Sequence, residues 1–234
     1  MQRLDLKTAL IGLAGDASAE PPDVIPGIAR HLAAAMPVYL ETWWPEHDRT
    51  NRSWVNFVIG DVLRYEAEWV ETATRVWGGR WLEGRLRVDA SAYANWAGGY
   101  TSNGPAHTVL WSADETNNEG LYGLELVFHE SGHMSSVAAP TRRLVAEIFR
   151  DAGVEEPRNL RHALIFATAG ELVRGIAASR GLPEHVPYVV REGLTGFRGW
   201  AEIWPAVERH WMPVVHGTAD PAAALRAIAE QVRG

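Results

Sequence analysis

The stretch His129-Glu130-Ser131-Gly132-His133 has the residue types and the spacing of a metal-dependent hydrolytic site. Two histidines four residues apart lie on one face of a helix and one turn apart, so both imidazoles can bind one metal ion. In this H-E-x-x-H arrangement the histidines bind zinc and the glutamate takes a proton from the zinc-bound water. Apolar residues at three- and four-residue spacing before the motif, namely Leu121, Leu124, Val127 and Phe128, predict the helix that it requires. The alternative is a helix with two ordinary histidines beside a surface glutamate.

A catalytic zinc ion usually takes three protein ligands, so two histidines alone are an incomplete site. The motif, followed by a second helix that carries Glu171, resembles the gluzincin metallopeptidases over roughly residues 86–180. That resemblance implies that Glu171 is the third ligand and that the core is zincin-like. Glu171 lies in an apolar segment, where an unpaired carboxylate would be costly to bury and a metal ion would remove that cost. The asparagine and aspartate that flank this ligand in the thermolysin-type pattern N-E-x-x-x-D are absent, since Gly170 and Gly175 occupy those positions.

His162 competes with Glu171 for the role of third ligand. The two residues are nine positions apart, which places them about 180° apart on a continuous helix, so only one of them can face the metal. Without a metal, His162 is an ordinary histidine that bonds a neighbour near the start of its helix. Glu125, one turn before His129, either orients an imidazole or faces water, and we expect it to face water.

These residues predict a zinc-dependent metallohydrolase with one Zn²⁺ ion bound by His129, His133 and Glu171. Glu130 is the expected general base, and the expected substrate is a peptide or a small amide. Tyr188 is the candidate that donates a hydrogen bond to the tetrahedral oxyanion, as the resemblance implies. If Tyr188 has no such role, the next candidates are three histidines, His185, His210 and His216. The alternatives to a peptidase are a zinc amide or ester hydrolase and a non-catalytic domain that a metal stabilises.

Composition excludes several classes of protein. The 234 residues contain no cysteine, so neither a disulfide framework nor a thiolate metal site exists. The net charge of -7 argues against a nucleic-acid binder, which normally shows a basic patch. No apolar run is long enough to span a bilayer. Localisation is left open: the chain reads as cytoplasmic as given, or as secreted if a signal segment has been removed.

The pattern along the chain predicts an α+β fold that is mainly helical, with a small sheet before the motif helix. We expect one domain, 1–234, with a helical part at 1–80, a zincin-like core at 86–180 and further helices at 181–234. The other expected elements are helices at 28–44 with a break before Pro37, 51–77, 141–150, 159–180, 200–212 and from 221, and strands at 86–90 and 107–112. Residues 98–105 read as a turn between the strands. We expect the strand at 107–112 to align a peptide by edge pairing, and most tryptophans to lie in the core.

Overall fold

A computed structural model describes residues 26–81, 86–93, 98–103, 106–111, 118, 120–196 and 199–233. The chain divides into two compact units, residues 1–53 and 54–234. The division falls inside a long helix, so no linker in the sequence marks it. None of the described helices is long and apolar enough to cross a membrane.

The described part of the first unit is helical. It contains α2, Pro26–Thr42, and the start of α3, Trp44–Trp77. The break expected before Pro37 is wrong, because α2 continues through this proline. The expected start of the long helix near residue 51 is also wrong, since α3 begins at Trp44 with Pro45 in its first turn. A proline is tolerated in a first turn, where its missing N–H has no partner within the helix.

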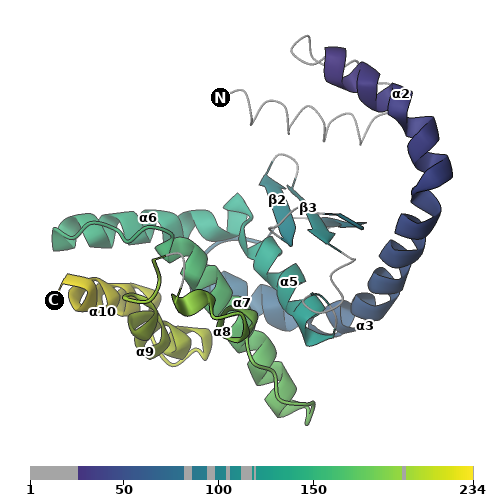
Figure 1. Ribbon diagram of the computed structural model, residues 1–234. Helices are drawn as coiled ribbons and strands as arrows, with labels where there is room; N and C mark the ends of the chain where they lie inside the picture. Colours follow the sequence, from purple (N-terminus) through teal and green to yellow (C-terminus); the bar gives the residue numbers. More distant parts are fainter. Residues whose placement is uncertain are drawn as a thin grey trace. The chain divides into compact units, whose positions relative to one another are not determined.

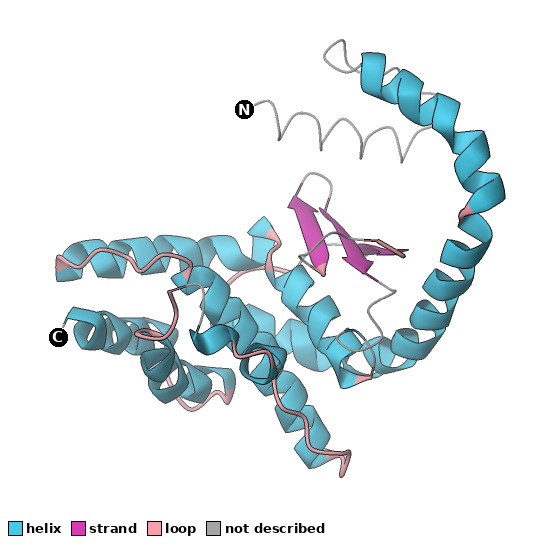
Figure 2. Ribbon diagram, viewed as in Figure 1, coloured by secondary structure: helices cyan, strands magenta, loops and turns pink. Residues whose placement is uncertain are grey.

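Three short strands precede the motif helix in the second unit: β1, Arg87–Ser91, β2, Gly99–Asn103, and β3, Ala106–Trp111. They form a sheet of order β1-β3-β2, in which β3 is parallel to β1 and antiparallel to β2 (Figure 2). The interpretation of residues 98–105 as a turn is therefore wrong for Gly99–Asn103. Edge pairing by the segment 107–112 is wrong as well, because β3 lies between two strands and its backbone groups pair with both.

Helices make up the rest of the second unit, as predicted for a mainly helical chain (Figure 1). They are α5, Leu121–Gly132; α6, Ser135–Ala152; α7, Leu160–Ser179; α8, Tyr188–Arg191; α9, Trp204–Val215; and α10, Pro221–Arg233, with a 3₁₀ turn at Leu194–Gly196. α5 packs against α7, α7 against α9, and α10 against both α9 and α6. The helix expected at 141–150 begins earlier, since α6 includes Pro140.

The close packing of α5 on α7 depends on small residues and on buried aromatic rings. A Cβ atom on Gly132 would lie 2.9 Å from the Trp77 ring and 3.1 Å from the Ile165 side chain, so a larger residue would push the helices apart. The Phe128 ring of α5 stacks on Trp69 of α3 at 5.0 Å. The tryptophans that are buried are Trp54, Trp69, Trp77, Trp200, Trp204 and Trp211, whereas Trp43 and Trp44 are exposed. The core prediction therefore holds for the second unit and not for the first.

Candidate metal centre

Three histidines from two helices meet at one point. The Nε2 atom of His129 lies 3.1 Å from Nε2 of His133, one turn further along α5, and 3.2 Å from Nε2 of His162 in the first turn of α7. All three ligand atoms lie within 4.8 Å of one another, so this cluster could hold a metal ion. The two helices that carry the cluster pack directly against each other, which fixes the position of His162 relative to the motif.

Two of the three separations between these nitrogen atoms fit a tetrahedral zinc site. Two nitrogen atoms that are each about 2.05 Å from a zinc ion, at a tetrahedral angle, are about 3.3 Å apart. The Nε2 separations of 3.1 and 3.2 Å are close to this value. Imidazole nitrogen is also a preferred ligand of zinc, and a set of three leaves a fourth position for water. The residues present therefore fit the ion that the motif predicts.

Apolar and aromatic groups surround the cluster. The Phe166 ring, one turn after His162 on α7, lies 4.0 Å from the His129 ring and 4.9 Å from the His162 ring. Trp200 contacts His162 edge-on at 5.8 Å and is fully buried. Burial lowers the pKa of His133 from 6.5 to about 4, and the positive charge of Arg142 adds to this effect. A neutral imidazole is the form that binds a metal.

Glu130 projects from α5 beside the histidines and toward the sheet. Around the helix axis, the position of Glu130 is about 100° from that of His129 and about 60° from that of His133. The residue is only 5 % exposed. Thr101 of β2 donates to the Glu130 carboxylate over 2.8 Å, from Oγ1 to Oε2. The sequence gives no direct signal for this contact, because Thr101 lies in the segment interpreted as a turn.

The structure does not bring Glu171 to the histidines. Its carboxylate accepts hydrogen bonds from Nη2 and Nε of Arg174, at 2.6 and 2.7 Å, and lies 2.6 Å from Nε2 of His216. α7 runs without interruption from Leu160 to Ser179, so Glu171 and His162 point to opposite sides of one helix. The structure therefore brings His162, and not Glu171, to the two motif histidines. The cost of burying the Glu171 carboxylate is offset by the Arg174 guanidinium and by the contact with His216, and no metal is needed for it.

Glu125 is buried and does not face water, contrary to our expectation. Its carboxylate lies 2.7 Å from Nε2 of His185 and accepts the backbone N–H of Tyr188 at 3.1 Å. The side chains of Glu125 and His185 are 3 % and 2 % exposed, respectively. Gly170 permits this contact, because a Cβ atom there would lie 3.0 Å from the Glu125 carboxylate and 2.6 Å from Pro187. The contacts of His185 and Tyr188 with Glu125 thus hold residues 185–188 against α5.

Tyr188 lies one aromatic ring away from the cluster. Its ring stacks on Phe166 at 6.3 Å, with 12° between the planes, and Phe166 in turn contacts His129 and His162. Among the other candidate histidines, His185 pairs with Glu125, His216 pairs with Glu171, and His210 contacts Gln231.

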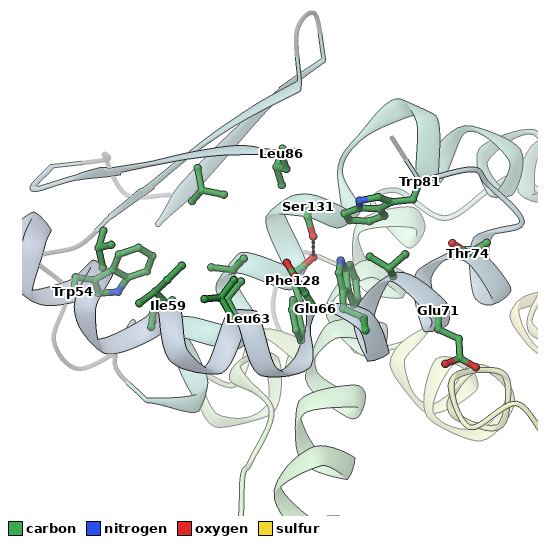
Figure 3. A pocket seen from close by; sticks show the side chains of 18 of the residues that line it. Trp54, Ile59, Leu63, Glu66, Glu71, Thr74, Trp81, Leu86, Phe128 and Ser131 are labelled. Carbon is green, nitrogen blue, oxygen red and sulfur yellow. Dashed lines mark hydrogen bonds between the residues drawn. The ribbon is translucent and has the colours of Figure 1, made fainter. Parts of the chain in front are cut away.

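An apolar groove of about 1260 Å³ lies on the opposite face of α5 (Figure 3). Its walls include Trp54, Ile59 and Leu63 of α3, together with Phe128 and Ser131 of α5. Phe128 and Ser131 are about 100° and 160° from His129 around the helix axis, and about 140° and 160° from His133, which places them on the side away from the histidines. The histidine cluster does not line this groove.

Comparison with known proteins gives no match to a family model, to a curated protein or to a solved structure. The interpretation of this centre therefore rests on its side-chain geometry.

Proposed function

We propose that this protein is a zinc-dependent metallohydrolase, and specifically a peptidase, whose single zinc ion is bound by His129, His133 and His162. The observation that supports this proposal is the meeting of three Nε2 atoms, at separations of 3.1 and 3.2 Å, beside the buried carboxylate-bearing residue Glu130. The proposed ligand set keeps the H-E-x-x-H motif and differs from the gluzincin expectation in its third member.

Each residue of the proposed site has one task. When bound, a zinc ion supplies Lewis acidity and lowers the pKa of a water molecule towards 7. Glu130 accepts a proton from that water and later delivers it to the leaving amine. The Phe166 and Trp200 rings keep bulk water from one side of the histidines, which strengthens the electrostatic interactions there. A purely structural metal site needs no base, so Glu130 beside the cluster favours catalysis.

The position of β2 favours an extended substrate. Among the strands that the structure describes, β2 is at the edge of the sheet, and its Thr101 touches Glu130. A peptide that paired with such an edge would lie along the strand that reaches the general base. The strand that aligns a peptide by edge pairing is therefore β2, and not the segment 107–112 for which the sequence had suggested this role.

Metal analysis together with a digest of a broad peptide library tests this function. After dialysis, the wild-type chain should retain about one zinc ion and should cleave members of the library. Glu130→Gln keeps the size and polarity of the side chain but removes the proton acceptor, so metal content should stay while turnover falls about 10²-fold or more.

Each other result has a distinct meaning. Zinc without peptide cleavage, but with turnover of small amides or esters, would replace the peptidase by another hydrolase. Zinc with no turnover would leave a domain stabilised by metal. A wild-type chain that holds no metal would reject the proposed centre.

A further inference from the structure

The strand β2 lies against the last turn of the motif helix α5. Residues alternate between the two faces of a strand, so Gly99 and Thr101 face the same side. Both meet Glu130: Thr101 through its hydroxyl group, and Gly99 through close contact of its backbone with the Glu130 side chain. One face of one strand thus contacts the single residue that the proposed function uses as base.

Thr101 has two acceptors on the same residue. Its Oγ1 lies 2.8 Å from Oε2 of the Glu130 carboxylate and 2.6 Å from the Glu130 backbone carbonyl oxygen. A hydroxyl group has one proton and therefore donates to one of these oxygens at a time. A carboxylate offers about four acceptor positions, so this bond leaves others for a proton from water.

Gly99 lies against the middle of the Glu130 side chain. A Cβ atom on Gly99 would lie 2.9 Å from Cγ and 3.1 Å from Cδ of Glu130, and 3.0 Å from Cδ2 of the buried Leu110. Real Cβ contacts are essentially never as short as the first of these. The Glu130 methylene groups therefore lie directly on the strand backbone, in space that only glycine leaves open.

From these contacts we propose that Gly99 and Thr101 are positioning residues for Glu130. The glycine provides the space, and the threonine hydroxyl holds the carboxylate in one rotamer beside the histidines. This inference rests on the proposed function for its catalytic meaning, whereas the contact itself does not depend on metal. A base held in one place is a better proton acceptor, because little reorganisation is needed when the reaction occurs.

A different explanation of Thr101 is that it only stabilises the end of α5. The Glu130 carbonyl is one of the last acceptors of the helix, and the backbone N–H of His133 also bonds it at 3.1 Å. In that case Thr101 would act on the helix end whether or not residue 130 carried a carboxylate. The two explanations therefore differ in how Thr101 variants depend on the identity of residue 130.

A double-mutant cycle between Thr101 and Glu130 separates them. Thr101→Val removes the hydroxyl group at constant shape, and kcat should fall by about 10- to 100-fold with unchanged zinc content and with KM little changed, the range seen when a supporting partner is lost. Thr101→Ser should regain most of this loss. In the Glu130→Gln chain, Thr101→Val should have no further effect on residual turnover. Ser102→Ala, on the other face of β2, is the matched control and should keep wild-type kcat.

A second cycle measures the urea-denaturation midpoint of the metal-free protein and therefore needs no activity. It combines Thr101→Val with Glu130→Ala. Thr101→Val should shift the midpoint more in the wild-type chain than in the Glu130→Ala chain. Equal shifts in both chains would overturn the proposal, as would a wild-type kcat in Thr101→Val. Absence of zinc or turnover in the wild-type chain would reject the proposed function, and the denaturation cycle would still decide whether Thr101 holds the carboxylate.

Discussion

Replacing His162 with alanine is the most direct test of the proposed ligand set. The variant leaves two Nε2 atoms, those of His129 and His133, which lie 3.1 Å apart. Zinc binding by four ligands in small structural sites has a free energy of about 10–16 kcal/mol, or about 2.5–4 kcal/mol for each ligand. With about 1.4 kcal/mol for each factor of ten, loss of one ligand should weaken zinc binding by about 10²- to 10³-fold. We therefore expect His162→Ala to lose zinc on dialysis and to lose turnover with it.

Glu171→Ala should have the opposite pattern. The Glu171 carboxylate bonds Arg174 and His216, whose side chains are 47 % and 48 % exposed, so water can hydrate both side chains when the carboxylate is removed. This partial exposure limits the loss of stability to about 1 kcal/mol. Zinc content and turnover should stay near those of the wild-type chain.

The assay is elemental analysis after dialysis against a graded series of a zinc chelator, which gives the relative zinc affinity of each variant. His210→Ala is the matched control, because His210 lies outside the histidine cluster and contacts Gln231. Far-ultraviolet circular dichroism shows whether each variant is folded. If His162→Ala bound zinc as tightly as the wild-type chain while Glu171→Ala lost it, the three-histidine site would be refuted and the gluzincin ligand set would be restored.

Two further predictions concern Tyr188 and His133. Tyr188→Phe keeps the ring that stacks on Phe166 but removes the hydroxyl group, so turnover should fall by about 10²-fold with zinc retained if that group donates to the oxyanion; unchanged turnover would exclude the role. In metal-free protein the pKa of His133 is lowered by burial to about 4 from 6.5, so below pH 6.5 the unfolded chain binds a proton that the folded chain does not. The free energy of unfolding should therefore fall by about 3 kcal/mol between pH 6.5 and 4, and urea titrations of the wild-type and His133→Gln chains should show that only the wild-type chain has this contribution.

The motif helix was predictable because its chemistry and its periodicity agree. His129 and His133 require a helix, and the apolar residues before them have helical spacing, so two signals indicate the same element. The bounds of α7 were also predictable within about one residue. Proline positions misled the prediction at Pro37 and Pro140, because each helix continues through its proline although the proline lacks one backbone hydrogen bond.

The third ligand was harder to predict, because each candidate had a local argument. Glu171 is buried, as its apolar neighbours indicated, but the side chains that pair with its carboxylate are Arg174, one turn away, and His216, 45 positions further along the chain. No local pattern reports a partner so distant in sequence. The strand β2 was missed for a related reason: the glycine at 99 is a turn signal when read locally, and it is a close-packing position when Glu130 lies against it.

The start of α7 determines whether a three-histidine centre can exist. Asn159, just before this helix, has φ 65°, and it is the one residue other than glycine with positive φ in the described part of the chain. Asparagine adopts this left-handed conformation more readily than most residues. The turn lets the backbone N–H groups of His162 and Ala163 bond the Asn159 carbonyl at 3.0 Å, so His162 lies within the first helical turn. A shift of one residue would rotate His162 by about 100° and take its imidazole away from α5. The direction in which the chain enters α7 is therefore as much a part of the proposed centre as the histidine itself.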